Sequence, residues 1–554
     1  MLITPVKGTN PENLSLYSFG GVLGLYYFPL SRFFTRIDTT LGVYQPSLEG
    51  SNGQAAFFWR AGGEAGFRFT PGFTLAVNAG WRQYSDSGGG AFNSGISVGL
   101  TAQISFQTGT GSARETVTAG FEQFEPVYPA FMQLYQTNPI GAVVIRNNEN
   151  AEIRDVQVSF RASPYTASEF PCGSVSLIAR GRSVELPLLA DFSPEILRFT
   201  DSGRILGELV IRYSFLGQQR EVIRALTVAT NNRNTVTTGD TAALAAFISP
   251  TSPETLAYAK HIAGLARANR RLAHNQNMQF ALWLHEGLRA SGVRLGTTYS
   301  SETEAQFPAE TLSHGTGSSR DLVLLFAAAL EGVGIPSAII KLEDEILVAF
   351  SLEIGRSAAE SMFNGLERIL VINDQVWLPL ATSVFNEGFM AAWRLGAAGL
   401  NKAFAAGKEV DFVLVEEAWA AYPPAPLPEQ GGRIVHTDPD AVKKEADQVM
   451  QQYIEQELAP LVRQVEAQAN SRPTAALYNR LAILMMRSGR VDAAKANYER
   501  AAGMGSVPAM TNRGNLALTE KDYATAERWY RRALTVESNN SAALWGLQQI
   551  EDRR

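Results

Sequence analysis

The chain contains very little cysteine, and its histidines are isolated from one another. Cys172 is the only cysteine in 554 residues, which excludes an intramolecular disulfide, a cysteine-rich zinc site and a CxxC redox motif. The five histidines form no HxxxH or HExxH pair. We therefore expect neither a metal site nor a cofactor.

Long apolar runs and long basic runs are also missing. No apolar stretch reaches the roughly 20 residues that a membrane-spanning helix needs, and the first residues lack the basic and apolar regions of a signal peptide. The net charge is −6, and the densest basic cluster is Arg267, Arg270 and Arg271. Because this cluster is too short to neutralise a run of phosphates, we do not expect nucleic acid as a partner. We interpret the cluster as the solvated face of a helix.

The first part of the chain alternates apolar and polar residues with period two, which is typical of β-strands. In the clearest run Phe73, Val77 and Trp81 fall on one face, while Asn78 and Arg82 fall on the other. Runs of this kind lie near 16–28, 33–44, 57–69, 73–82 and 96–106. An apolar outside with charged residues facing inward is the inverse of a soluble sheet and is what a lipid-embedded barrel needs.

This pattern resembles small outer-membrane β-barrels. We interpret residues 1–107 as a partial outer-membrane-type β-barrel of about five strands that contacts outer-membrane lipid. About eight strands are the practical minimum for closure. We therefore expect the chain to begin downstream of its true start, with three strands and a leader missing. A soluble antiparallel sheet is the alternative.

A β-sandwich is predicted next. Residues 108–123 are rich in Gly, Thr and Ser, which is typical of a linker. Residues 124–232 hold short alternating strands with turn signals every ten or so residues, which predicts a two-sheet sandwich of Ig-like type. We place Cys172 in a connection of this sandwich and interpret it as an idle thiol.

The segment 307–336 reads FPAETLSHGTGSSRDLVLLFAAALEGVGIP. It resembles the core of bacterial transglutaminase-like proteins, where a motif such as FPxETLxxxxGDCDDLxxLxxxLLExxGIP opens the catalytic helix of a papain-like fold. The matching positions are Gly317, Asp321, Leu322, Leu325, Leu330, Glu331, Gly334, Ile335 and Pro336. The resemblance implies an α+β domain, which we assign to residues 233–405.

The three positions that carry catalysis in that family are different here. Ser319 stands at the position of the nucleophilic cysteine, Glu345 in EDEILVAF at that of the histidine, and Ala381 in WLPLATS at that of the orienting acid. A serine hydroxyl needs a positioned general base even more than a cysteine does. The resemblance therefore implies a pseudoenzyme, without catalytic residues. Serine is also a favoured helix N-cap, which gives Ser319 a structural interpretation.

The C-terminal part is predicted to be helical. Residues 406–438 contain a Pro/Gly-rich linker, and 439–472 predict a charged helix. Residues 473–554 repeat at an offset of 32, as from 494 to 526, and resemble the tetratricopeptide repeat, which is about 34 residues long. The residues expected to line the groove of these repeats and to bind a protein or peptide are Asn479, Arg487, Thr511 and Asn515.

The predicted fold is multidomain: a partial antiparallel outer-membrane-type barrel, an Ig-like sandwich, an α+β transglutaminase-like domain and α-helical tetratricopeptide repeats. The expected function is that of a non-catalytic scaffold or protein-interaction protein of the bacterial cell envelope. We expect it to be anchored in the outer membrane with its other domains in the periplasm. Two alternatives stay open: a serine-dependent hydrolase or transferase that uses Ser319, and a soluble peptide- or protein-binding protein.

Overall fold

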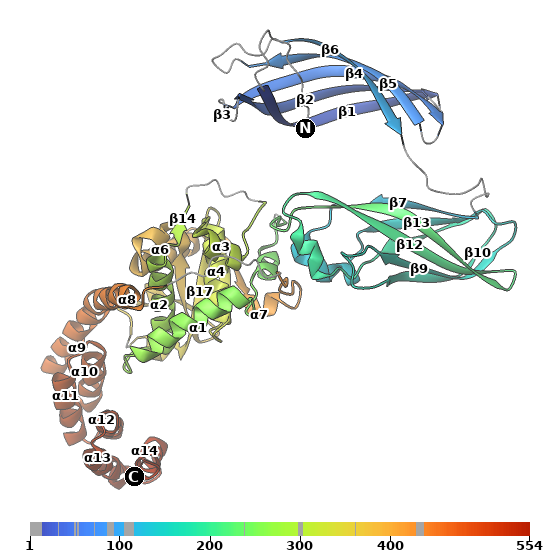
Figure 1. Ribbon diagram of the computed structural model, residues 1–554. Helices are drawn as coiled ribbons and strands as arrows, with labels where there is room; N and C mark the ends of the chain where they lie inside the picture. Colours follow the sequence, from blue (N-terminus) through green and yellow to red (C-terminus); the bar gives the residue numbers. More distant parts are fainter. Residues whose placement is uncertain are drawn as a thin grey trace. The chain divides into compact units, whose positions relative to one another are not determined.

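The computed structural model forms two compact units, Met1–Arg114 and Glu115–Arg554 (Figure 1). It describes residues 14–30, 33–48, 51–52, 55–70, 73–85, 94–104, 116–237, 239–296, 303–360, 362–427 and 437–553. Parts of several sequence-based assignments lie outside these residues, among them 1–13 and 105–107 of the barrel region, 108–115 of the first linker, 297–302 of the domain 233–405 and 428–436 of the second linker.

The first unit is an antiparallel sheet in the order β1-β2-β4-β5-β6, with the short β3 paired to β2. Its strands are β1 (Leu14–Leu30), β2 (Phe33–Leu48), β3 (Ser51–Asn52), β4 (Ala56–Thr70), β5 (Phe73–Tyr84) and β6 (Gly95–Ile104). The five long strands coincide with the five runs of period-two alternation. The prediction of strands in these runs is therefore confirmed.

The two faces of this sheet differ sharply in chemistry. One face holds an ion-pair cluster in which Asp38, whose side chain is 1% exposed, is bound by Arg36 and Arg60, while Arg36 also pairs with Glu64 at 3.1 Å. The other face carries large apolar side chains that are 40–84% exposed: Phe19, Leu23, Leu25, Tyr27, Ile37, Leu41, Val43, Phe57, Trp59, Phe67, Val77, Trp81, Ile96, Val98 and Leu100. The charged side chains are thus largely shielded from solvent, whereas the large apolar side chains are exposed.

The second unit begins with two antiparallel sheets, in the orders β11-β8-β7 and β10-β9-β12-β13. Their strands are β7 (Val117–Gln123), β8 (Gly141–Asn147), β9 (Ile153–Arg161), β10 (Phe170–Ile178), β11 (Ser183–Leu188), β12 (Gly203–Phe215) and β13 (Gln218–Thr230). Short 3₁₀ helices η1 (Pro129–Gln136) and η2 (Pro194–Arg198) lie in the connections. Alternate residues of β8 and β9, such as Val143 and Val158, are buried in the shared core.

Two expectations for this region are wrong. Residues 117–123, expected to belong to a linker, form β7, because their small polar residues alternate with Val117, Ala119 and Phe121 and pair with β8. Cys172 lies within β10 and not in a connection. Its thiol is buried and lies 3.3 Å from the carbonyl oxygen of Leu189, and burial raises its pKa.

A region of mixed helices and strands follows. Its helices are η3 (Thr241–Phe247), α1 (Pro253–Ala268), α2 (Gln276–Ala290), α3 (Pro308–His314), α4 (Ser319–Glu331), α5 (Arg356–Ala359), η4 (Leu366–Arg368), η5 (Thr382–Glu387), α6 (Phe389–Ala405) and α7 (Val415–Ala418). Its strands are β14 (Arg294–Leu295), β15 (Thr316–Gly317), β16 (Ser337–Lys341), β17 (Ile346–Gly355), β18 (Leu370–Ile372), β19 (Gln375–Ala381) and β20 (Asp411–Leu414).

The sheet of this region has the order β18-β19-β17-β16-β20 and is covered on both faces. Val348 and Leu378 share a core with α2 and α4, whereas Leu347 and Ala349 pack with Leu400 near the end of α6. β20 and α7 lie inside the expected linker 406–438, so that boundary is wrong. The strand was missed because only four residues pair with β16, beside a segment rich in Pro and Gly.

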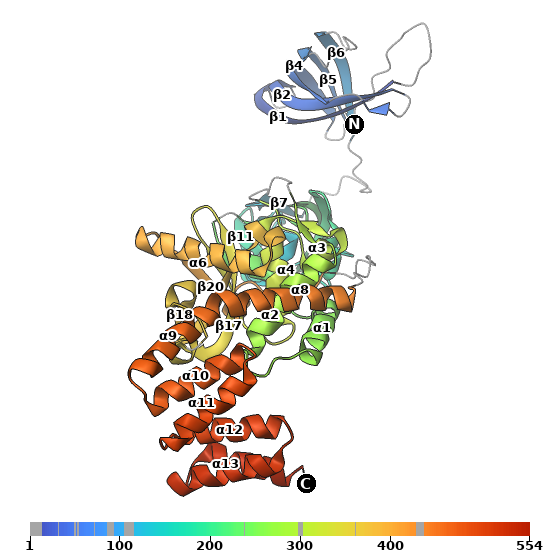
Figure 2. The ribbon, with the colours of Figure 1, turned by 90° about the vertical axis from the view of Figure 1, so that its left-hand side faces the viewer.

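The remaining chain is helical. Its elements are α8 (Pro439–Tyr453), the π-helical turn η6 (Ile454–Leu458), α9 (Ala459–Ser471), α10 (Ala475–Arg487), α11 (Val491–Gly503), α12 (Val507–Thr519), α13 (Tyr523–Val536) and α14 (Ser541–Glu551). Figure 2 shows α10 to α13 stacked in succession. The Tyr453 hydroxyl donates to the carbonyl oxygen of Met362 at 2.8 Å, and buried Glu457 pairs with Arg368, so these helices are joined to the mixed region.

The architecture as a whole is multidomain, with antiparallel sheets followed by a C-terminal helical region. The prediction of a mixed β and α protein is confirmed at this level. Among the described residues, none of the helices has both the length and the apolar character required to cross a membrane.

Candidate functional site

The N-terminus of α4 carries two adjacent serines, and the first of them caps the helix. The Ser318 side chain accepts a hydrogen bond from the backbone N–H of Asp321, and the Asp321 carboxylate accepts one from the backbone N–H of Ser318 at 2.8 Å. This reciprocal pair is a capping box. The interpretation of Ser319 as the cap is therefore wrong, because Ser319 is already the first helical residue.

The hydroxyl group of Ser319 is bound to Thr382, which lies directly after β19. The two hydroxyl oxygens are 2.7 Å apart, and the Thr382 hydroxyl also lies 2.7 Å from the carbonyl oxygen of Ser319. A hydroxyl has a single hydrogen. Thr382 therefore donates to the carbonyl oxygen and accepts the hydrogen of Ser319. A neutral hydroxyl oxygen is not a general base, so this contact does not activate Ser319.

Glu345 and Ala381 lie beside this pair. β17 and β19 are antiparallel with Leu347 opposite Ala381, so Glu345 is level with the residues that follow Ala381. The Ser383 hydroxyl donates a hydrogen bond to the Glu345 carboxylate. The structure thus brings the three sequence-derived positions together through Thr382 and Ser383. These two residues were missed as site residues, although their place directly after Ala381 in WLPLATS was a usable signal.

No histidine among the described residues is hydrogen-bonded to Ser319. His314 ends α3 with an exposed side chain. His285 is buried in α2, where its Nδ1 atom lies 3.0 Å from the carboxylate of Glu286. Burial lowers the pKa of His285, which favours the neutral imidazole, and its Nε2 atom has no hydrogen-bond partner within the described part of the chain. The rings that surround it are Phe326, Phe385 and Phe389.

A cavity of about 370 Å³ lies beside the α4 N-terminus, on the side of Ser318. Its lining is largely polar and includes Asp321, His314, Glu310 and Asn234. The Asp321 and Glu310 carboxylates are already bound by groups of the protein itself. The hollow therefore offers both hydrogen-bonding groups and apolar surface to anything that enters it.

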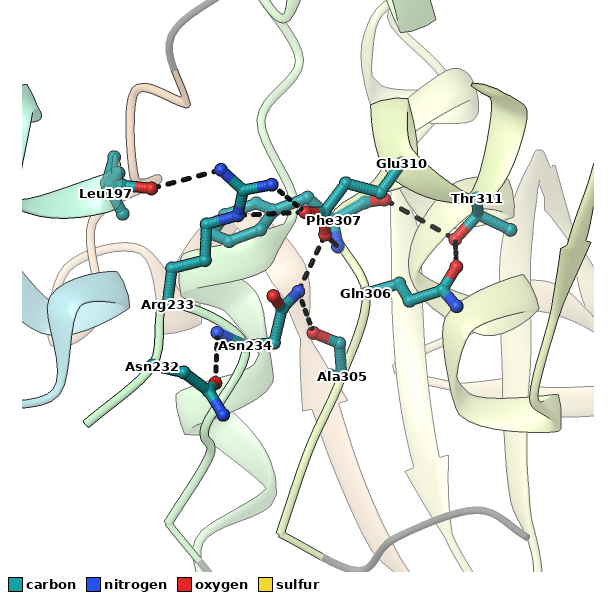
Figure 3. A network of polar contacts seen from close by, with 9 residues as sticks. All are labelled: Leu197, Asn232, Arg233, Asn234, Ala305, Gln306, Phe307, Glu310 and Thr311. Carbon is teal, nitrogen blue, oxygen red and sulfur yellow. Dashed lines mark hydrogen bonds and ion pairs between the residues drawn. The ribbon is translucent and has the colours of Figure 1, made fainter. Parts of the chain in front are cut away.

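A polar network connects the β-sandwich to α3 next to this cavity (Figure 3). The Arg233 guanidinium donates to the Glu310 carboxylate at 2.9 Å and to the carbonyl oxygen of Leu197 at 3.2 Å. The Asn234 amide donates to Glu310 at 2.6 Å and to the carbonyl oxygen of Ala305 at 2.8 Å. Arg233 and Asn234 were missed by the sequence analysis, and no pattern pointed to them, since 77 residues separate Arg233 from Glu310.

Two of the residues expected to line a repeat groove are taken up by contacts within the protein. Thr511 is buried, and its hydroxyl donates to carbonyl oxygens of its own helix. Arg487 donates from Nε to the carbonyl oxygen of Ala273 at 3.1 Å, so it contacts the mixed region. Neither position fits the expectation of an open groove, because Thr511 is buried in the helical stack and Arg487 contacts the segment between α1 and α2.

The other two expected groove residues hold neighbouring helices together. Asn479 accepts a hydrogen bond from the Asn512 amide at 3.1 Å, which links α10 to α12. Asn515 is exposed, and its side-chain oxygen accepts a hydrogen bond from the Tyr530 hydroxyl at 2.7 Å. Asn515 is thus the one of the four with an exposed side chain.

Hydrogen bonding is the chemistry that the Ser319 site offers. Ser319 supplies a hydroxyl that is already bound, and Glu345 a carboxylate that Ser383 holds. Within the described ranges, no group of three or more His, Cys, Asp and Glu side chains is arranged to hold a metal ion. Comparisons of the chain with models of protein families, with curated proteins and with solved structures give no match.

Proposed function

We propose that this chain is a non-catalytic interaction protein of a bacterial cell envelope. In this proposal residues 233–405 form a transglutaminase-like domain that keeps its scaffold and has lost the groups that activate a nucleophile. Residues 124–232 are an Ig-like spacer, and 473–554 are tetratricopeptide repeats. The convergence of Ser319, Glu345 and Ala381 at one end of β17 and β19 supports the transglutaminase-like assignment.

The observation that carries the proposal is the hydrogen bond between Ser319 and Thr382. In a catalytic serine site an imidazole, itself held by a carboxylate, takes the hydroxyl proton. Here the Ser319 hydroxyl donates to the Thr382 hydroxyl, with the two oxygens 2.7 Å apart, and the nearby Glu345 carboxylate accepts a hydrogen bond from Ser383. Both groups that could take part in catalysis are satisfied by neutral partners, which favours a role in binding.

The experiment that tests the absence of catalysis uses the full chain in a neutral detergent and a fluorophosphonate probe, which labels activated serines. We expect no probe adduct on Ser319, and none on the corresponding peptide of Ser318→Ala or Ser319→Ala. Stable labelling that is lost in Ser319→Ala and kept in Ser318→Ala would instead establish the serine-dependent hydrolase or transferase.

A second experiment tests the transglutaminase-like geometry itself. The triple variant Ser319→Cys, Glu345→His, Ala381→Asp restores the family's three residue types. A neighbouring imidazole lowers the pKa of a thiol, so we expect iodoacetamide to alkylate position 319 faster near pH 6 in the triple variant than in Ser319→Cys alone. Equal rates in the two variants would argue against the assignment. Peptide mapping separates this thiol from buried Cys172.

The first unit supports attachment to outer-membrane lipid. Its exposed face is apolar and its covered face holds the ion pairs of Asp38, which is the polarity that lipid-facing strands require. Trp59 and Trp81 lie on the apolar face. In vesicles of brominated lipid we expect quenching of a fluorescence component that disappears in the double variant Trp59→Phe, Trp81→Phe. If the full chain stays soluble without detergent and shows no such quenching, the soluble alternative is correct.

The stacked helices α10 to α14 supply the surface for a protein or peptide partner in this proposal. Each helix packs mainly on its neighbours in sequence, which leaves a continuous outer surface, as in other repeat arrays. α14 ends the stack with Leu544 and Trp545 exposed. Tryptophan is enriched among residues that dominate binding energy, so Trp545 is the first residue to change once a partner is known.

A further inference from the structure

A cavity of about 480 Å³ lies at the opposite end of α4 from Ser319. It is bordered by the C-terminal half of α1, the first turn of α2, residues 333–335 after α4, and residues 352–354 of β17. α4 has 13 residues, which corresponds to about 20 Å of helix. This cavity is therefore separate from the candidate site, and nothing inferred about it depends on the proposed function.

Two arginines at the rim of this cavity form no ion pair within the described part of the chain. Arg267 lies in the last turn of α1 and Arg270 just beyond it, and both side chains are exposed. Neither forms a salt bridge with any residue that the structure describes. Arg271, the third arginine of the same cluster, pairs with Asp447 at 3.0 Å. The cluster interpreted from sequence as a solvated helix face thus divides into one structural arginine and two that border a cavity.

The inner wall combines apolar groups with one carboxylate. Phe280, Ile335 and Leu352 line the cavity and are almost fully buried. Glu353 also lines it, and its carboxylate accepts a hydrogen bond from the Asn277 amide at 3.2 Å.

β17 is locally distorted where it forms this wall. Its pairing with β19 is interrupted between Ser351 and Gly355, and Glu353 has φ of +52°, a left-handed conformation that costs free energy for a residue with a side chain. The Ser351 hydroxyl oxygen accepts a hydrogen bond from the backbone N–H of Glu353 at 3.0 Å and so holds this conformation. Bulges of this kind often re-aim side chains next to functional sites.

We infer that this cavity binds the C-terminal residue of a peptide whose last side chain is apolar. The guanidinium groups of Arg267 and Arg270 bind the terminal carboxylate, since a planar guanidinium matches a carboxylate with two parallel hydrogen bonds. The Glu353 carboxylate accepts the backbone N–H of the bound residue. The wall of Phe280, Ile335 and Leu352 packs against the apolar side chain. The cavity thus has a cation for the terminal carboxylate, a carboxylate for the backbone N–H and an apolar wall for the last side chain.

The test measures binding of two peptides to the full chain in neutral detergent by isothermal titration calorimetry. The peptides are acetyl-Gly-Gly-Phe with a free carboxylate and the same peptide with a terminal amide. We expect the acid to bind at least about tenfold more tightly than the amide, because a charge-assisted hydrogen bond contributes about 1.5 kcal/mol or more. Arg267→Gln and Arg270→Gln should each weaken binding of the acid by about tenfold.

The matched control is Arg182→Gln, which removes an exposed arginine in the turn between β10 and β11 and should leave the affinity unchanged. The inference is overturned if the acid and the amide bind equally, if the acid does not bind, or if the two arginine variants behave like the control. Competition by inorganic phosphate at the same concentration as the peptide would also overturn it, since the cavity would then recognise any anion.

Discussion

Glu286 is a carboxylate that the structure buries completely, and three groups hold it in place. It accepts hydrogen bonds from the backbone N–H of Phe389 at 2.9 Å and from His285 at 3.0 Å, and it pairs with Arg289. Burial alone would raise the pKa of Glu286, but the contacts with His285, Phe389 and Arg289 outweigh it, so the pKa lies below its usual value. Because Gly388 has no side chain to cap α6, Glu286 of α2 does so from outside the helix.

Replacing Glu286 should therefore destabilise the mixed region. We expect Glu286→Ala to lower the free energy of unfolding by about 3 kcal/mol, because it leaves Arg289 and the start of α6 without their buried partner. Urea denaturation followed by the fluorescence of buried Trp283 and Trp393 measures the change. The control is Glu466→Ala on the exposed face of α9, which should change the stability by less than about 0.5 kcal/mol.

His274 should make the stability of the protein depend on pH. Its burial, with the charges of Arg271 and Arg487, lowers its pKa from 6.5 to about 4. Between these values the unfolded chain binds a proton that the folded chain does not, so stability is present above pH 6.5 and is lost as the pH falls towards 4. We expect a loss of about 2 kcal/mol over this range.

The measurement is the midpoint of urea unfolding between pH 7 and pH 4.5 for the unaltered chain and for His274→Phe. The variant should have the shallower dependence on pH, since the ring that resists protonation has been removed. His261→Phe serves as the control, because His261 is exposed on α1. Parallel profiles for all three chains would contradict the assignment of pH sensitivity to His274.

At the residue scale the sequence indicated three positions of the candidate site and missed Thr382 and Ser383, which hydrogen-bond to two of them. Ser319, Glu345 and Ala381 were found because a continuous motif contains each of them. The capping serine was placed one residue too late, although Ser318 and Asp321 have the spacing of a capping box and could have corrected it. Contacts such as that between Arg233 and Glu310 could not be predicted, since they depend on how two distant segments pack.

At the scale of elements, the close packing of α12, α13 and α14 depends on two glycines. A Cβ atom at Gly514 would lie 2.7 Å from the ring of Tyr530, and one at Gly546 would lie 2.3 Å from the same ring. Both distances are shorter than two non-bonded carbon atoms can approach each other without a shift of one of them. Tyr530 is completely buried between the two helices, so its ring has little freedom to move.

We expect Gly514→Ala and Gly546→Ala each to destabilise the last three helices by about 1–3 kcal/mol, despite the better helix propensity of alanine. Hydrogen exchange of peptides from α12 to α14, followed by mass spectrometry, reports this local loss. Gly503→Ala is a matched control in α11, because its Cβ would meet no atom within 4 Å. Unchanged exchange in the two tyrosine-facing variants would show that the ring can move aside.

Elements were predictable where one physical pattern extended over many residues. The five long strands of the first unit each contain at least ten residues of alternation, and their existence was predicted correctly. β20 has four residues, too few for a periodic signal, and was assigned to a linker. β7 was missed because its small polar residues have the composition of a linker, whereas its pairing with β8 comes from the fold.

At the scale of the whole molecule, the network of Arg233, Asn234 and Glu310 is one of the contacts between the β-sandwich and the mixed region, because Arg233 also donates to the carbonyl oxygen of Leu197 (Figure 3). The side chains of Arg233 and Glu310 are 11% and 7% exposed. Removal of one member leaves the other charged and largely buried, which is more costly than the loss of a surface pair.

We expect Arg233→Ala to lower the free energy of unfolding by about 3 kcal/mol. The double variant with Glu310→Ala should lose less than the sum of the two single variants, with a coupling of at least about 1 kcal/mol in a double-mutant cycle. Arg198→Ala removes a solvent-exposed pair with Glu195 nearby and should cost less than about 0.5 kcal/mol. Additive effects of Arg233 and Glu310 would mean that the two do not act as one contact.

The strand order of the first unit limits how identical copies could assemble. Five long strands that alternate in direction leave β1 and β6, the two edges, running the same way. Rotation about an axis that runs along the strands preserves their direction. In copies arranged around such an axis, β6 of one copy would therefore pair in parallel with β1 of the next. Any ring that keeps antiparallel pairing throughout must therefore insert an odd number of additional strands between β6 and the next β1.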